Sequence, residues 1–309
     1  MSPINRREFL RKGATGLASI PAIASISCTQ TPQPAPAPSK PEPTGPPLGI
    51  PVGLQLYTLR DTIAKDFEGV IKQVAAIGYK NVEVYDFYGK SPAEVKKILD
   101  DNGLKAPSGH WLLAKLRKSV AKCIEEAKEV GCEYLVMPIL DNPADRRTLD
   151  QYKRLVEFFN KTGAQCKKAG LTFAYHNHNF EFQKFGDTTA FDFLLKSLDP
   201  ELVKMEMDCF WVTHAGHDPV TYMENYPGRF PLLHIKDLVA GNSPATELDA
   251  EKGAKLFAEV GQGTIDWKRI FTAAPKGGLK YYFVEQDYCG RPPIESVKMS
   301  YDYLSKLAV

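Results

Sequence analysis

A short pattern recurs along the sequence where an amphipathic stretch gives way to an apolar run. The pattern is a glycine followed by an apolar or aromatic residue, and it occurs at Gly78, Gly103, Gly131, Gly170 and Gly278. Glycine ends helices readily because its backbone adopts the left-handed conformation that other residues avoid. The sequence therefore predicts a repeated unit of about 30 residues, in which a helix stops at glycine and a strand begins.

The chain from about residue 50 onward follows this alternation of strand and helix. Strands are predicted at 50–57, 81–85, 104–108, 134–137, 172–177, 202–208, 230–237 and 281–285. Helices are predicted at 66–78, 91–103, 120–131, 144–169 with Gly163 as a candidate break, 191–198, from 219, from 266 and at 292–307. Such alternation requires parallel strands joined by right-handed crossovers, and eight units fit a (β/α)8 TIM barrel better than an open doubly wound sheet.

The first 28 residues have the composition of an export signal and not of a folded domain. Arg6 and Arg7 form a twin-arginine pair ahead of a weakly apolar run of small residues at 13–27. An ordinary basic amphipathic helix is the alternative interpretation. We predict export by the twin-arginine route, to the periplasm or to the cell envelope.

Cys28 closes this leader, and the chain then becomes rich in proline up to residue 48. Cys28 is a candidate for lipidation, which leaves a lipoprotein and a soluble periplasmic protein as open alternatives. Residues 29–48 combine proline with Gln, Ala, Ser and Lys, a composition that cannot bury a core and predicts an extended tether. The predicted organisation is a leader at 1–28, a linker at 29–48 and a barrel domain at 49–309.

The charge balance limits the partners that the barrel can attract. The net charge is +2 for 309 residues, so no strong positive field is available for nucleic acid or for an anionic membrane. We expect a small carbohydrate as the partner and no nucleic acid. Membrane contact is expected only through a lipid anchor, and a homo-oligomer is compatible with the sequence.

Four consecutive predicted strands end on side chains that bind metal ions. The first runs into His176, His178 and Glu181, and the next three end at Asp208, His234 and Glu285. The carboxyl ends of parallel strands meet at the same end of a barrel, where such enzymes keep their chemistry. One shared cation at this end is therefore the predicted feature of the site.

These strand ends and the loops beside them resemble the xylose isomerase-like TIM barrels. This sugar phosphate isomerase/epimerase group also includes AP endonuclease and inosose dehydratase relatives. The resemblance covers about residues 50–307 and rests on the motifs Ala174-Tyr-His-Asn-His-Asn-Phe-Glu-Phe182, Met207-Asp-Cys-Phe-Trp211 with Ala215-Gly-His-Asp-Pro219, His234-Ile-Lys-Asp237, and Val260-Gly-Gln-Gly-Thr-Ile-Asp-Trp267.

The resemblance implies one divalent cation at the barrel mouth, held by Asp208, His234 and Glu285. The fourth ligand is either Glu181, which would reach back from the loop, or His176, which stands where the family usually has glutamate. Oxygen and imidazole ligands suit manganese, the metal expected first, and also Mg, Co or Zn.

Such a cation can stabilise the enediolate that forms when a proton leaves the carbon next to a carbonyl. Glu181 and Glu285 are the candidates for taking and returning that proton, and Lys236 is a candidate acid or oxyanion partner. Further side chains are expected to contact the sugar, namely His176, His178, Glu83, His110, Gln55 and Trp211.

Three functions follow as hypotheses from this chemistry. The first is a metal-dependent sugar isomerase or epimerase. The second is a lyase, dehydratase or deglycosidase that acts on keto-sugars or 3-keto-glycosides at the same metal site. The third is a non-catalytic saccharide-binding surface protein. An AP endonuclease is disfavoured, because the near-neutral charge does not suit a DNA-binding surface.

Overall fold

The computed structural model describes residues 45–248 and 253–309. The leader predicted at 1–28 and most of the linker predicted at 29–48 lie outside the described residues, so export, lipidation and tethering stay predictions. The described chain begins beside the short 3-10 helix η1 (Pro47–Gly49), in which Pro47 is buried. None of the described helices is both long and apolar enough to cross a membrane.

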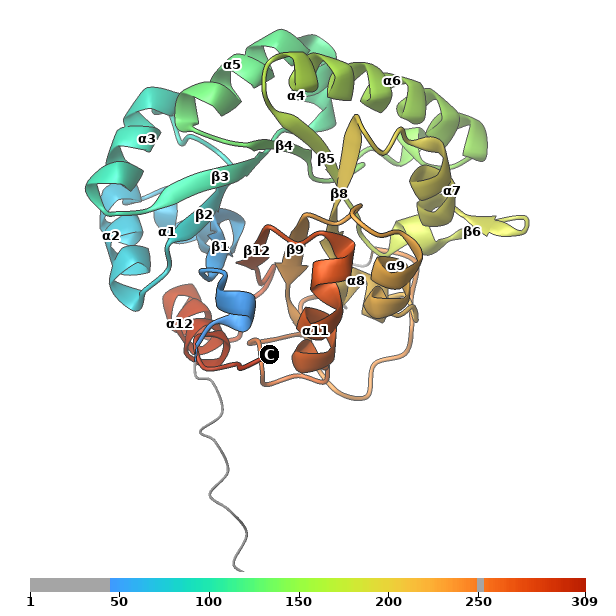
Figure 1. The fold of residues 1–309 in the computed structure, drawn as a ribbon. Helices are drawn as coiled ribbons and strands as arrows, with labels where there is room; N and C mark the ends of the chain where they lie inside the picture. The colour runs from blue at the N-terminus through green and yellow to red at the C-terminus, as the bar shows by residue number, and fades with distance from the viewer. Residues whose placement is uncertain (1–44, 249–252) are drawn as a thin grey trace, which may run out of the picture. The chain divides into compact units, whose positions relative to one another are not determined.

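Eight parallel strands close into a barrel, which confirms the predicted (β/α)8 fold (Figure 1). Their order around the barrel is β1, β12, β9, β8, β5, β4, β3 and β2. The strands span β1 (Gly53–Gln55), β2 (Asn81–Val84), β3 (Lys105–His110), β4 (Tyr134–Met137), β5 (Thr172–His176), β8 (Val203–Asp208), β9 (Leu232–Ile235) and β12 (Tyr281–Val284).

Helices follow one another around the outside of the strands, as Figure 1 shows for α2 to α7. They span α1 (Arg60–Ile63), α2 (Phe67–Ile77), α3 (Pro92–Asp101), α4 (Leu113–Lys118), α5 (Val120–Val130), α6 (Leu149–Lys168), α7 (Ala190–Ser197), α8 (Cys209–His214), α9 (Pro219–Asn225), α11 (Trp267–Gly277) and α12 (Pro293–Leu304). The short helices α1, α4 and α8 were not predicted. Helix α8 forms because the Asp208 carboxylate at the end of β8 accepts a hydrogen bond from Trp211 N and caps it.

Helix α6 corrects two predictions for the segment between β4 and β5. It begins at Leu149 and not near residue 144, because Thr148 and Gln151 form a capping box at its start. Gly163 does not break it. A Cβ atom at Gly163 would lie 2.3 Å from the Leu202 carbonyl oxygen, so glycine is needed for close packing of α6 against the chain entering β8.

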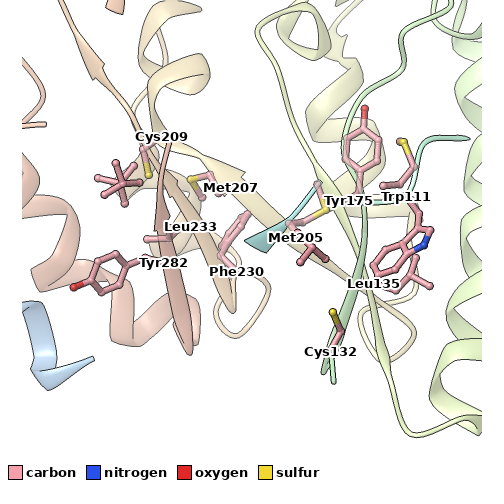
Figure 2. Packing of buried hydrophobic residues seen from close by; sticks show 14 of the residues in the cluster. Trp111, Cys132, Leu135, Tyr175, Met205, Met207, Cys209, Phe230, Leu233 and Tyr282 are labelled. Carbon is pink, nitrogen blue, oxygen red and sulfur yellow. The ribbon is translucent and has the colours of Figure 1, made fainter. Parts of the chain in front are cut away.

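The two faces of each strand have different tasks, and β8 makes the division clear. Val203, Met205 and Met207 point toward the helices and belong to the main hydrophobic core. Figure 2 shows Met205 and Met207 in that core together with other buried side chains. The alternate residues of β8, Glu206 and Asp208 among them, point into the barrel, because neighbouring side chains of a strand face opposite sides.

A small apolar layer closes the barrel interior beneath the polar strand ends. It consists of four buried side chains from different strands, Val136, Ala174, Leu232 and Phe283. Two residues further along, His176 follows Ala174, His234 follows Leu232 and Glu285 follows Phe283. The period of two that fills this layer with apolar groups therefore delivers the polar groups directly above it.

Two short ribbons lie in the loops, β6 (Lys184–Phe185) with β7 (Thr188–Thr189), and β10 (Asp237–Leu238) with β11 (Phe257–Ala258). Asp237 fixes the loop that follows β11. Its carboxylate accepts hydrogen bonds from Gly261 N at 2.8 Å, Ile265 N at 3.1 Å and Trp267 Nε1 at 3.0 Å. The loop with Gly261 is thus anchored at the carboxyl end of β9.

Candidate active site

Strand register brings four potential metal ligands together at the carboxyl end of the barrel. His176 on β5, Asp208 on β8, His234 on β9 and Glu285 after β12 each offer one ligand atom, and these atoms all lie within 4.8 Å of one another. Asp208 pairs directly with His234 across β8 and β9. All four residues are buried. This set, called the mouth group below, contains the three ligands that the resemblance implies and His176.

His176 is held in the orientation that a metal ligand needs. Its Nδ1 lies 2.9 Å from the carbonyl oxygen of Pro138, which can only accept a hydrogen bond. The proton therefore sits on Nδ1, and the lone pair on Nε2 points toward Asp208 Oδ2 at 3.4 Å and His234 Nδ1 at 3.2 Å. Burial lowers the pKa of His176, which keeps the ring neutral as ligation requires.

His234 is held in the same way from its other side. Its Nε2 lies 2.7 Å from Glu83 Oε2, and Glu83 is itself fixed by hydrogen bonds from Gln55 and Ser108. A His234 that donates Nε2–H to Glu83 keeps Nδ1 for a cation, an arrangement typical of metal-binding histidines. Nδ1 lies 2.7 Å from Glu285 Oε2, within the mouth group.

Asp208 supplies the clearest sign that the mouth group fits a cation. One carboxylate oxygen, Oδ1, caps α8 through Trp211 N at 3.0 Å. The other, Oδ2, is buried and accepts no hydrogen bond from any described residue, although Lys236 Nζ forms an ion pair with it at 3.0 Å. A buried carboxylate oxygen with a free lone pair, next to two oriented imidazoles, suits a divalent cation.

A second set of buried ligand atoms, made by Glu83, His110, Glu206 and His234, shares His234 with the mouth group. A neutral imidazole has one lone pair, so His234 can bind a cation in one set at a time. Nε2 of His234 donates its hydrogen bond to Glu83, so this nitrogen has no lone pair for a cation in the second set. The second set therefore serves as the support that orients His234.

Glu206 and Asp287 belong to this centre and were missed in the sequence. Glu206 Oε2 lies 2.9 Å from His110 Nε2, and Asp287 Oδ1 accepts a hydrogen bond from Lys236 Nζ at 2.8 Å. Each stands two residues from a predicted ligand, Glu206 before Asp208 and Asp287 after Glu285. The period of two along a strand was the signal that could have found both.

Glu181 lies apart from the mouth group. Its buried carboxylate accepts hydrogen bonds from the Tyr175 hydroxyl and from His178 N at 2.8 Å. Tyr175 points away from the barrel interior, on the face of β5 opposite His176, so Glu181 sits behind the strand. Of the two expected fourth ligands, the structure brings His176 to the other three and does not bring Glu181. Burial raises the pKa of Glu181 to about 7.

Lys236 ties the acidic side chains of the mouth together. Its ammonium lies 2.7 Å from Glu285 Oε2, 2.8 Å from Asp287 Oδ1 and 3.0 Å from Asp208 Oδ2. Burial lowers the pKa of Lys236, but the neighbouring carboxylates outweigh burial and hold it well above the ordinary value. The same pairing with Lys236 lowers the pKa of Asp208 to about 2 against the effect of burial. Both groups are therefore charged at neutral pH.

A cavity of about 320 Å³ opens over the mouth group. Six residues of the predicted site line it, namely His110, His176, His178, Trp211, Lys236 and Glu285. His178 lies between the rings of Phe180 and Trp211, with centroid distances of 5.5 and 5.4 Å. The predicted sugar contacts Gln55 and Glu83 are fully buried and do not line the cavity. Gln55 instead donates a hydrogen bond to Glu83, and Glu83 contacts His234.

Comparisons with known proteins agree with this geometry. A family model described as xylose isomerase-like TIM barrel matches residues 71–306. In sequence the chain is 27% identical over 266 residues to inosose dehydratase of Lacticaseibacillus casei, which covers 77% of this chain and 88% of that protein. The barrel fold of the structure therefore agrees with the family description.

Two solved structures extend the comparison. The chain resembles a sugar phosphate isomerase/epimerase from Parabacteroides distasonis with a TM-score of 0.66 and 30% identity, over 82% of this chain and 93% of that one. It also shares its fold with the IOLI protein, whose structure holds a zinc atom, with a TM-score of 0.65 and 14% identity over 82% and 98% of the two chains. At that identity the second likeness concerns the fold alone.

Proposed function

Since the chain belongs to the xylose isomerase-like TIM barrel family, we propose that it is a metal-dependent lyase acting on a keto-sugar or a related cyclic ketone. The enzyme takes a proton from the carbon next to the carbonyl and expels a group from the following carbon. The curated relatives named inosose dehydratase, which are lyases by name, support this choice.

The observation that carries the proposal is the charge of the cavity lining. Lys236 is the one lysine or arginine among the described lining residues, and three carboxylates within 3.0 Å neutralise it. Phosphate groups are bound by free cations or by clusters of Arg and Lys, and the part of the lining that the structure describes offers neither. The cavity therefore suits an unphosphorylated substrate, which argues against a sugar phosphate isomerase.

The mouth group, His176, Asp208, His234 and Glu285, is the set that would hold the metal. A divalent cation there would polarise a substrate carbonyl and would stabilise the negative charge that develops on its oxygen. Manganese, magnesium, cobalt and zinc all suit these donors. The residues around the mouth group supply proton transfer and orientation.

Glu285 and Lys236 can act as the base and the acid of an elimination. Glu285 lines the cavity, is ionised because Lys236 and His234 lower its pKa against burial, and can accept the proton next to the carbonyl. Protonation of Glu285 removes a negative charge 2.7 Å from Lys236 Nζ, which lowers the pKa of Lys236. Lys236 then becomes a better donor to the leaving oxygen. One proton accepted and one delivered complete the reaction.

An isomerase or epimerase is the second candidate, because the structurally similar protein at 30% identity carries that name. In that reaction the abstracted proton returns to carbon and no group leaves. The same base, Glu285, would serve both reactions. The fate of the substrate separates the two.

The test is incubation of the metal-loaded protein with unphosphorylated keto-sugars and inososes in deuterium oxide, followed by mass and NMR analysis of the products. A lyase forms an unsaturated ketone with loss of water or an alcohol, and Glu285→Gln abolishes it. Deuterium in an isomerised sugar without loss of a group would establish the second candidate instead. Binding without either change would favour the saccharide-binding protein.

We further propose that the leader directs export of the folded enzyme. Arg6 and Arg7 are the observation behind this proposal. Replacement of both by lysine is expected to retain the protein in the cytoplasm, as measured by fractionation. Cys28→Ala separates the two remaining forms, because it releases a lipoprotein from the membrane and leaves a soluble periplasmic protein where it was.

A further inference from the structure

The lining of the cavity changes character from the strand ends to the loops. The polar side chains, such as His176, Lys236 and Glu285, come from the ends of the barrel strands or the positions just beyond them. The segments that follow five of the strands contribute aromatic rings instead, namely Tyr57, Tyr85, Trp211, Phe257 and Tyr288. These five residues are called the collar. They follow β1, β2, β8, β9 and β12, which lie side by side in the barrel.

The rings of the collar support one another in two groups. Tyr57 and Tyr85 pack edge to face with centroids 4.7 Å apart. Phe257 contacts Trp211 edge to face at 5.9 Å and Tyr288 at 6.1 Å. Such contacts hold the rings in place, so the collar is a prepared surface and not a set of loose side chains.

Besides the polar residues His178 and Asp287, the described lining contains three aliphatic residues, called the aliphatic wall. Leu112, Ile139 and Leu248 have side chains without hydrogen-bonding atoms. A sugar hydroxyl group placed against these three side chains would find no hydrogen-bond partner on them, which is unfavourable away from water. The wall therefore suits a part of the ligand that has few hydroxyl groups.

Two exposed apolar side chains that line the cavity also favour an apolar part of the ligand. Tyr288 is 40% exposed and Leu248 is 38% exposed, whereas most large apolar side chains of the described chain are buried. Both line the cavity. Exposed apolar surface continuous with a binding cavity is typical of a ligand site, because a bound apolar group removes that surface from water.

We propose that the substrate is a keto-glycoside whose leaving group is an aryl alcohol, with the aryl group bound by the collar and the keto-sugar over the mouth group. This inference rests on the proposed lyase function and adds the chemical class of the group that leaves. An aromatic group stacks on aromatic side chains and needs few hydrogen bonds, which matches the lining of this wall.

The reaction balances without an oxidant or a further reactant. In a 3-keto-glycoside the proton on C2 passes to Glu285, and the electron pair of that C–H bond forms the new double bond between C2 and C1. The bond from C1 to the aryloxy oxygen breaks, its electron pair stays on oxygen, and Lys236 protonates this oxygen. The products are an unsaturated keto-sugar and a free aryl alcohol.

The test compares two substrates across variants of the full metal-loaded chain. The substrates are the 3-keto derivatives of methyl glucoside and of 4-nitrophenyl glucoside. Tyr288→Ala and Phe257→Ala are expected to lower kcat/KM for the nitrophenyl substrate by about tenfold, with less than about twofold change for the methyl substrate. Val239→Ala is the control, because Val239 is exposed but does not line the cavity. The ratio of kcat/KM for the two substrates is compared between each variant and the wild type, because the intrinsic difference between the two leaving groups cancels in that comparison.

An equal effect of the collar variants on both substrates would overturn the collar proposal while leaving the lyase intact. If neither substrate eliminates, the lyase proposal fails, and binding of unoxidised 4-nitrophenyl glucoside then decides on the collar. Weaker binding by Tyr288→Ala with unchanged binding of methyl glucoside would still support it, and equal binding by both proteins would refute it. Thermal unfolding of each variant confirms that the fold is retained.

Discussion

Two buried glutamates on opposite sides of the barrel wall have different surroundings. Glu285 lies in the barrel mouth, where Lys236 and His234 approach its carboxylate to 2.7 Å. Glu181 lies behind β5, where it is fully buried and receives hydrogen bonds from Tyr175 and His178 N. The pKa of Glu285 falls well below the ordinary value despite burial, whereas burial raises that of Glu181 to about 7.

The comparison teaches that burial alone does not make a carboxylate a metal ligand. The mouth collects cationic and imidazole groups that keep Glu285 charged, and a cation can take over that role. Behind β5 the nearest partners are neutral donors, so a proton is the species that Glu181 favours. The following predictions test this contrast, beginning with the largest expected effect.

Removal of two carboxylates of the mouth group is expected to abolish metal binding. Loss of an outer hydrogen-bond partner weakens metal affinity by up to about 100-fold. Asp208 and Glu285 would contact the ion itself, so the double variant Asp208→Asn/Glu285→Gln should weaken metal affinity by more than this. Metal content of the purified protein from Gly45 onward measures it. About one ion per chain should disappear in the variant, and its retention would refute the assignment of the mouth group.

Lys236→Met should lower the free energy of unfolding of the metal-free protein. Without the ammonium, Asp208, Glu285 and Asp287 lose a buried cation, and breaking a buried ion pair from one side costs about 3–5 kcal/mol. Urea unfolding in the presence of a chelator is the measurement, and added divalent metal is expected to restore part of the loss. An unchanged stability would mean that water or protons already neutralise these carboxylates.

Glu83→Gln should loosen the hold on His234 without removing a ligand. Gln cannot accept the Nε2–H proton as strongly as a carboxylate does, so metal affinity is expected to fall about 10–100-fold. Titration with cobalt, followed by its visible absorption, measures the affinity independently of activity. Gln73→Glu on the exposed surface of α2 is a control that changes charge far from the mouth. Equal affinities in Glu83→Gln and wild type would remove Glu83 from the support of the site.

Glu181→Gln gives the smallest effect and the sharpest contrast. Metal content is expected to stay at the wild-type level, because Glu181 lies outside the mouth group. The native protein holds the Glu181 proton more tightly than the unfolded chain does, so wild-type stability falls as pH rises from about 4.5 to about 7. The variant lacks this loss. Between pH 4 and pH 8 its free energy of unfolding should therefore rise, relative to that of the wild type, by at most about 3 kcal/mol.

Urea unfolding of wild type and Glu181→Gln at both pH values measures the difference. A parallel pH dependence of the two proteins would show that Glu181 titrates normally. Loss of metal in Glu181→Gln would instead return Glu181 to the ligand set.

Much of the fold could be predicted because its signals are local. Glycines at helix ends and strands of period two set the eight units, and both are properties of neighbouring residues. Asp208, His234 and Glu285 could be predicted to lie together because each ends its own strand, and the structure brings their ligand atoms within 4.8 Å of one another. The helix boundary at Leu149 was missed because a capping box at Thr148 outweighed the apolar pattern before it.

The parts of the site that were missed depend on which side chains meet after the barrel has closed and on which of them reach the cavity. Glu206 was overlooked because an acidic residue inside an apolar strand also fits a charge pair on the surface, and only barrel closure brings it to His110. Gln55 and Glu83 were expected to touch sugar, but they are fully buried, and Gln55 holds Glu83 against His234 instead. Sequence does not state which inward-facing side chains reach the cavity and which support others.

Local sequence patterns are enough to predict a barrel of alternating strands and helices, with acidic and imidazole groups where the strands end. Only the folded chain shows that His176 joins these groups and that Glu181 does not. Strand β5 turns His176 toward the barrel interior and Tyr175 to the outside, and Glu181 is hydrogen-bonded to Tyr175 on that outer side. The folded chain also decides that segments distant in sequence form one aromatic collar. Local patterns fix which way a side chain faces, but only closure of the barrel fixes which side chains meet.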